Sequence, residues 1–207
     1  MSQLYEIHIS INVKTALDEM KWYYYCKDNN YKIIRVLNNK GQNDIQNMIS
    51  KWCTRDTEKE VIEYANTLAE NMSKAGFDVC RVKVEGMMMN REYDSLELKN
   101  VTGKYWEFHF KIIIENSKEL ERLLSLKELN SSIDIWKNVA LSMSSYGTTR
   151  YPIMTIRLHN GTCWRAVNIK NQIIDVLKEN NFHIYDKLQS ECAIYDSYPE
   201  EDAGWII

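Results

Sequence analysis

Two segments of the chain alternate between apolar and polar residues, and both carry the pattern aromatic-Glu-apolar-His-apolar. They are residues 4–13, with Tyr5 to Ile9 at the centre, and residues 104–114, with Trp106 to Phe110 at the centre. Side chains alternate between the two faces of a strand. The pattern therefore predicts two strands, each apolar on one face and polar on the other.

The remaining periodicity predicts further elements in a similar order after each of these strands. Helices are expected over residues 15–29, 57–75, 117 onward, 133–143 and 165–180, and strands over residues 31–37, 77–85, 151–159 and within 182–195. Leu17, Met20 and Tyr24 fall along one side of the first helix, and Thr57 with Glu60 has capping-box spacing. Residues 42–56 are expected to form a loop with a short helical turn, and residues 86–103 a polar connection. A turn is expected at residues 38–41, which end in Gly41.

The order of elements indicates an internal duplication. Each half is predicted as β-α-β-α-β, with one added helix in the second half, and Ala75-Gly76-Phe77 corresponds to Asn180-Asn181-Phe182 at a helix-to-strand junction. We therefore predict an α+β fold of two pseudo-symmetric lobes, residues 1–90 and 91–207. Each lobe would carry a sheet with helices on one face, and a cleft would lie between the lobes.

Composition limits the kind of protein. The chain has 207 residues and a formal net charge of −3, so a broadly basic nucleic-acid surface is not expected. Its five cysteines are odd in number and contain no C-x-x-C pair, which favours a reducing, intracellular location over a disulfide framework. No signal peptide or membrane-spanning apolar run is visible. An Asn-, Ile- and Lys-rich composition is typical of AT-rich genomes, including those of large DNA viruses.

The repeated Glu-x-His is the main candidate for chemistry. Residues two apart on a strand share a face, so Glu6, His8 and Ser10 lie together, as do Glu107, His109 and Lys111. If the halves are related by a two-fold axis, the two histidines can meet across the cleft. Each would have a carboxylate beside it, and paired histidines can act as base and acid. The plain alternative is a polar sheet face covered by water.

The His8-Ile9-Ser10 segment resembles the H-x-[ST] motif of the 2H phosphoesterases, whose two pseudo-symmetric α+β lobes each bring one such motif to a central cleft. The resemblance implies that His8 and His109 act as base and acid on 2′,3′-cyclic phosphates or 2′-5′ linkages of a nucleotide or RNA end, without a metal or other cofactor. It also implies that Ser10 binds the phosphate. The second motif departs from the family pattern, because Lys111 stands where a hydroxyl is expected. We place Glu6, Glu107 and Arg157 with these substrate-binding residues.

A metal site is a second interpretation. Two Glu and two His from paired modules could supply mixed nitrogen and oxygen ligands to zinc, iron or manganese. This arrangement is similar to that of the vicinal-oxygen-chelate enzymes, although their modules run β-α-β-β-β. Lys111 beside the site disfavours a cation, so we expect no metal.

A third interpretation is a non-catalytic module that binds a ligand or a protein in the same cleft. The aromatic run Trp22 to Tyr25 is too wide to be buried entirely and could contact a protein partner. Arg35 and Arg157 lie on corresponding strands and could reach an anion. The tail should dock and bring Asp196 and Asp202 near the site. No P-loop, G-x-G-x-x-G, G-x-S-x-G or H-E-x-x-H motif is present.

Overall fold

The computed structural model describes residues 2–38, 45–88, 93, 95–99, 103–144, 151–185 and 189–202. The helices are α1 (Ala16–Asp28), α2 (Glu58–Lys74), α3 (Ser117–Leu129) and α4 (Cys163–Glu179), with 3-10 helices η2 (Asp134–Asn138) and η3 (Pro199–Asp202). The strands are β1 (Gln3–Asn12), β2 (Lys32–Asn38), β3 (Ile45–Arg55), β4 (Asp78–Met87), β5 (Glu97–Lys99), β6 (Tyr105–Ile113), β7 (Val139–Ser144), β8 (Pro152–Leu158), β9 (Asn160–Thr162), β10 (His183–Ile184) and β11 (Gln189–Asp196). The predicted α+β class is confirmed.

Both halves of the chain have the same order of main elements, β-α-β-β-α-β, which is the ferredoxin-like arrangement. In the first half the strands lie side by side in the order β4-β1-β3-β2. In the second half, β11-β6-β8-β7 repeats that order. The expected turn at residues 38–41, the boundary at residues 90–91 and tail residues 203–207 lie wholly or partly outside the described residues.

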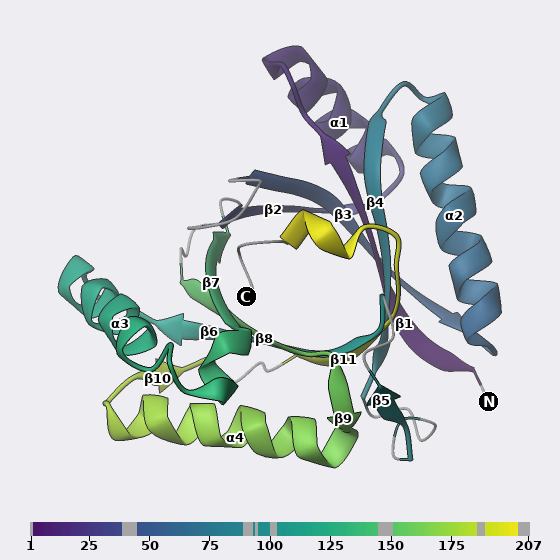
Figure 1. The fold of residues 1–207 in the computed structure, drawn as a ribbon. Coiled ribbons are helices and arrows are strands. Elements are labelled where there is room, and N and C mark those ends of the chain that lie inside the picture. The colour runs from purple at the N-terminus through teal and green to yellow at the C-terminus, as the bar shows by residue number, and fades with distance from the viewer. Residues whose placement is uncertain are drawn as a thin grey trace.

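The strands of both halves join into one sheet. Antiparallel pairing of β4 with β11 and of β2 with β7 connects the halves, and pairing of β6 with β8 closes the nine-stranded sheet into a barrel. Figure 1 shows the barrel nearly end-on, with α1 to α4 outside the ring and η3 within its outline. The sequence predicts a separate sheet in each half. Instead, the two halves together enclose the interior of a single barrel.

Three segments differ from the prediction, and in one of them, β3, the strand lacks a clean apolar face. Residues 45–55 are the long strand β3 rather than a loop, and its side chains at Gln46 and Met48 face the barrel interior. The predicted helix over residues 133–143 is the short η2 followed by β7. Gly86 and Met87 continue β4 instead of opening a polar connection.

The apolar core lies between the outer face of the barrel and the helices. Tyr5, Ile7 and Ile9 of β1 are completely buried on this face. The predicted capping box of α2 is present, since Thr57 and Glu60 bond each other's backbone N–H groups. The corresponding helix ends also match, because Gly76 and Asn181 both have positive φ, 91° and 59°.

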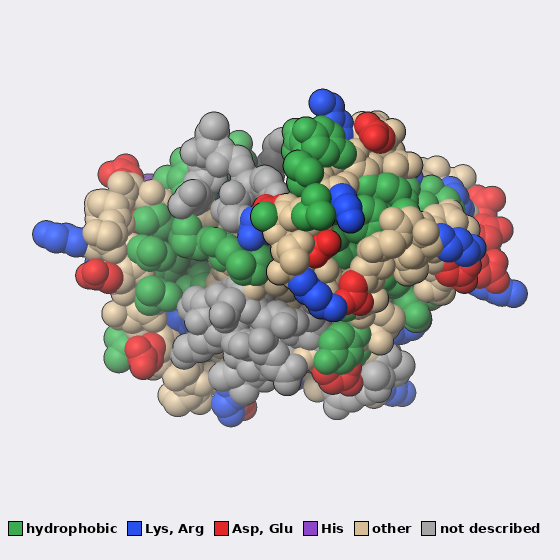
Figure 2. Space-filling model, turned by 90° about the horizontal axis from the view of Figure 1, so that it is seen from above, with side chains coloured by type: hydrophobic (Ala, Val, Ile, Leu, Met, Phe, Trp, Pro, Cys, Tyr) green, Lys and Arg blue, Asp and Glu red, His purple; other side chains and the backbone are tan. Residues whose placement is uncertain are grey.

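The face of α1 that packs on the barrel is not the predicted one. Trp22 and Cys26 are buried, whereas Leu17, Met20 and Tyr24 are each more than half exposed. Figure 2 views the molecule from the side on which α1 lies and shows apolar side chains at this surface. The aromatic run is divided, with Trp22 in the core and Tyr23 and Tyr24 outside.

Candidate functional site

A cavity of about 180 Å³, with many charged residues in its lining, occupies the barrel interior. It is lined by the inward-facing residues of strands from both halves, because alternate residues of a barrel strand point inward. All seven predicted site residues line it: Glu6, His8, Ser10, Glu107, His109, Lys111 and Arg157. The structure thus brings the predicted residues together, while their roles stay a prediction.

The His8 ring lies against two carboxylates from neighbouring strands. Its Nε2 is 2.9 Å from Glu85 Oε2 on β4 and 3.8 Å from Glu6 Oε1. Glu6 accepts hydrogen bonds from the Ser50 hydroxyl and from Gln189, the latter over 3.4 Å. The buried Nδ1 of His8 has no hydrogen-bond partner among the described residues. One nitrogen of this imidazole is therefore oriented by Glu85, and the other makes no hydrogen bond to the described residues.

The His109 ring is held at both nitrogens. Its Nε2 is 3.4 Å from Glu107 Oε2, and its Nδ1 is 3.0 Å from Thr155 Oγ1. Arg157 donates to Glu107 Oε1 through Nε at 3.0 Å and Nη2 at 2.7 Å. Burial alone would raise the pKa of Glu107, but Arg157 and Lys83 hold that pKa well below its ordinary value. Glu107 is thus a fixed anion beside His109.

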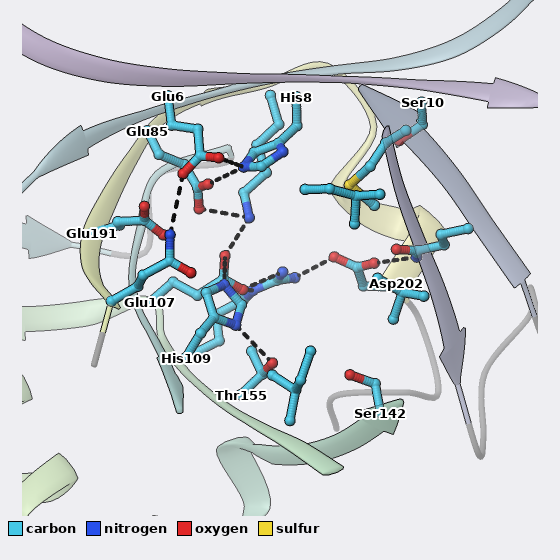
Figure 3. A pocket seen from close by; sticks show the side chains of 18 of the residues that line it. Glu6, His8, Ser10, Glu85, Glu107, His109, Ser142, Thr155, Glu191 and Asp202 are labelled. Atoms are coloured by element: carbon cyan, nitrogen blue, oxygen red, sulfur yellow. Dashed lines mark hydrogen bonds and ion pairs between the residues drawn. The ribbon is translucent and has the colours of Figure 1, made fainter. Parts of the chain in front are cut away.

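Lys83 connects the two histidine sites. Its ammonium lies 2.7 Å from Glu85 Oε1 and also contacts Glu107 Oε2. Burial favours the neutral amine, yet Glu107 and Glu85 raise the pKa of Lys83 well above its ordinary value. A chain of contacts therefore runs from His8 through Glu85, Lys83 and Glu107 to His109. Figure 3 labels four of its members, His8, Glu85, Glu107 and His109, around the cavity.

The same cluster is where a metal ion would find ligands. Among the described residues, Glu85, Glu107 and His109 present ligand atoms within 4.8 Å of one another. Lys83 already contacts both carboxylates, so a metal cation would have to displace its ammonium group. Of the two Glu and two His expected as ligands, Glu107 and His109 belong to this group and Glu6 and His8 do not; Glu85 is its third member.

Glu191 of β11 is a cavity residue that the sequence reasoning missed. It is 1% exposed, and its Oε1 accepts no hydrogen bond from the described residues. Burial, followed by the nearby Glu85 and Glu6 carboxylates, raises the pKa of Glu191 well above its ordinary value. This side chain is thus a neutral carboxylic acid over much of the pH range in which Glu107 is charged.

The tail contributes a second charged cluster, as expected for Asp196 and Asp202. Asp196 accepts from Arg81 at 2.8 and 2.5 Å and from the Tyr105 hydroxyl at 2.7 Å. Asp202, from η3, lines the cavity and pairs with Arg81 at 2.8 Å and Arg157 at 2.7 Å. Arg157 is therefore a buried cavity residue.

The cavity also carries positive charge at exposed positions. Lys32 of β2 and Lys111 of β6 both line it and are exposed. Ser10 is buried and lies opposite Arg81 in the sheet register. Arg35, considered with Arg157 as an anion-binding candidate, lies outside this cavity and pairs with Glu19 of α1 at 2.6 Å.

Comparisons with known proteins give no functional assignment. No family model and no curated protein match the chain. Matches among solved structures include a mutant chlorite dismutase from Candidatus Nitrospira defluvii, at 9% identity and a TM-score of 0.33, covering 93% of this chain and 92% of that one. A putative chlorite dismutase matches at 9% identity and a TM-score of 0.32, covering 99% and 100%. Likeness at this level carries no argument about fold or activity. None of the described helices is long and apolar enough to cross a membrane.

Proposed function

We propose that the barrel cavity is the active site of a metal-independent phosphoesterase that acts on a cyclic phosphate at a nucleotide or RNA end. The observation that supports this proposal is the meeting of two histidine–carboxylate pairs in one cavity. Glu85 lies 2.9 Å from His8 Nε2 and within 4.8 Å of a ring nitrogen of His109. The two rings therefore lie near a common carboxylate, as expected for two proton-transfer groups that act on one phosphate.

The surroundings of the rings suggest their roles. His8 has an unoccupied Nδ1 and is oriented by Glu85, so it is the base that takes a proton from the attacking water. His109 is held at both nitrogens and lies beside the ionised Glu107, and we assign it as the acid. As water adds to phosphorus, one ester P–O bond breaks and His109 gives its proton to the departing oxygen. The product is a phosphomonoester, and the proton held by His8 returns to His109 through solvent.

The size and charge of the cavity restrict how a substrate could bind. A volume of about 180 Å³ is below the range of roughly 300–1,000 Å³ that is typical for whole organic ligands. Only the phosphate group and the sugar atoms bonded to it would enter the cavity, and the nucleobase of the substrate would stay outside. Lys32 and Lys111, exposed and on the cavity lining, supply the positive charge that favours an anionic group there.

The test is turnover of 2′,3′-cyclic nucleotides by the wild type, His8→Ala and His109→Ala. Loss of a proton-transfer group should lower kcat by roughly 10²- to 10⁴-fold. His183→Ala is the matched control, because His183 is exposed on β10 and is absent from the cavity lining. Equal turnover by wild type and both cavity variants, or equal loss in all three variants, would remove the histidines from the mechanism.

The alternative is that the cavity binds its ligand without chemistry. The charges that line it are held by buried ion pairs, such as Arg157 with Glu107 and Lys83 with Glu85, which is also what a preorganised binding site requires. Calorimetric binding of a cyclic nucleotide that survives mixing without hydrolysis, and that His8→Ala leaves unchanged, would favour this function. The protein contact through Tyr23 and Tyr24 stays a prediction.

A further inference from the structure

The carboxylate of Asp202 is bound in the way that a protein binds a small anion. Its Oδ1 accepts from Gln46 Nε2 at 2.8 Å and Arg81 Nη1 at 3.0 Å. Its Oδ2 accepts from Arg81 Nη2 at 2.8 Å and pairs with Arg157 Nη1 at 2.7 Å. Each oxygen thus has two donors, and Arg81 binds the carboxylate as a two-pronged fork, the geometry typical of arginine with carboxylate or phosphate.

The donors belong to the barrel, whereas the carboxylate belongs to the tail. Gln46, Arg81 and Arg157 lie on β3, β4 and β8, and each is at most 4% exposed. Among the η3 residues whose side chains are described, Asp202 is buried, Pro199 is half-buried and Glu200 is exposed. Among the described side chains of η3, Asp202 is the one with hydrogen bonds and ion pairs to the barrel.

The donors would stay in place without Asp202, because each arginine has a second carboxylate on the barrel wall. Arg81 is also bound by Asp196 of β11, and Arg157 by Glu107 of β6. These ion pairs fix the guanidinium planes independently of the tail. Departure of Asp202 would leave a preformed cluster of donors beside the cavity.

We infer that Gln46, Arg81 and Arg157 form a binding site for a small oxyanion, a carboxylate or a phosphate group, in which Asp202 of the same chain is the resident ligand. The inference does not depend on the proposed phosphoesterase activity, since it concerns the barrel donors that bind Asp202 and not the histidines. Asp202 is tethered, so its effective concentration is of the order of millimolar or higher. A simple anion would therefore compete poorly with the wild-type tail. To displace Asp202, a natural ligand needs contacts in the cavity in addition to those of its anionic group.

Chemical rescue separates this inference from a purely structural ion pair. Asp202→Ala removes the carboxylate and leaves space, whereas Asp202→Asn fills the same space without a charge. Both variants should melt at a lower temperature than the wild type, by roughly 10 °C, because buried arginine donors lose their anion. Sodium formate or inorganic phosphate, against sodium chloride of equal ionic strength, should restore the Tm of Asp202→Ala along a saturable curve. Formate and phosphate are separate arms, which distinguish a carboxylate ligand from a phosphate ligand.

The matched controls decide the outcome. Asp202→Asn should not respond to either anion, and neither should Asp134→Ala, which removes an exposed carboxylate paired with Lys137. Asp202→Ser serves the same purpose if the alanine variant does not fold, since its small side chain also leaves space. No response of the small-residue variant, or the same response in all variants, would overturn the inference and leave Asp202 as a structural ion pair.

Discussion

Replacing Lys83 by Met removes a buried ammonium that two carboxylates share. The Lys83 side chain is 11% exposed, and its partners Glu85 and Glu107 are 1% and 0% exposed. Removing one member of a buried ion pair leaves an uncompensated charge and costs about 3–5 kcal/mol. Glu107 keeps Arg157, so most of this cost should arise at Glu85, which keeps only the weaker partner His8. For a chain of about 200 residues the Tm should fall by roughly 6–20 °C.

The pH dependence of this loss has a definite sign. In the wild type, burial alone would raise the pKa of Glu85, but Lys83 and His8 lower it. The Lys83–Glu85 ion pair therefore stabilises the fold above the ordinary Glu pKa, and this stabilisation is lost as the pH falls. In Lys83→Met, burial dominates and the pKa of Glu85 rises, so protonation relieves the penalty in acid. The difference in unfolding free energy between wild type and variant should therefore be largest at neutral pH and smaller near about pH 4.5.

Urea unfolding followed by tryptophan fluorescence at both pH values measures the difference. Lys59→Met is the control, since Lys59 forms an exposed pair with Glu63 on α2 and should change stability little at either pH. Lys83→Met combined with Glu85→Gln should recover part of the loss, because the unpaired charge is then absent. A Lys83→Met variant within about 1 kcal/mol of wild type at neutral pH would refute the assignment of Lys83 as the shared counter-ion.

Three further outcomes are expected. Glu191→Gln should gain stability relative to wild type as the pH rises from about 5 to 9, because the raised pKa of Glu191 means that the wild type must ionise a buried acid. Thermal melts across this pH range measure the difference in Tm, and a difference that does not change with pH would contradict the prediction. Trp22→Ala should lower the free energy of unfolding by about 3–5 kcal/mol and Tyr23→Ala by about 0.5 kcal/mol or less, since Trp22 is fully buried and Tyr23 is 46% exposed. Equal losses of unfolding free energy in denaturant titrations would show that the buried face of α1 is misassigned. Burial raises the pKa of the Cys26 thiol to about 12, so mass spectrometry should find it alkylated only after unfolding, and rapid labelling of the native protein would count against this burial.

Strands with one continuous apolar face could be predicted from the sequence, whereas β3, whose two faces are mixed, could not. β1 and β6 bury an unbroken apolar row against the helices, so their period of two is clear. β3 places Gln46, Met48 and Ser50 toward the interior and Asn47 among the outward residues, so polar and apolar side chains occur on both faces. Closure of the sheet depends on pairings between the halves, which leave no local pattern.

The residues of the candidate site also fall into some that the sequence pattern predicted and others that it did not. His8 and His109 could be found because their motif recurs, and both line the cavity. Arg81, Lys83 and Glu85 were missed, although Val82 and Val84 separate them in strict alternation. An isolated charged face resembles a solvated one, and only closure into a barrel makes it an interior. Asp202 also depends on this closure, because its arginine partners come from different halves.

The duplication explains why two chemically different histidines occupy one cavity. Glu6-x-His8 and Glu107-x-His109 hold corresponding places in the two halves, but their neighbours differ. Glu6 accepts from a serine and a glutamine, whereas Glu107 is held by Arg157 and Lys83. The two rings therefore lie in different surroundings, one beside a carboxylate bound by neutral side chains and the other beside a carboxylate bound by two cations. Equivalent backbone positions therefore place two histidines in unequal environments, and in the proposed mechanism this inequality separates the base from the acid.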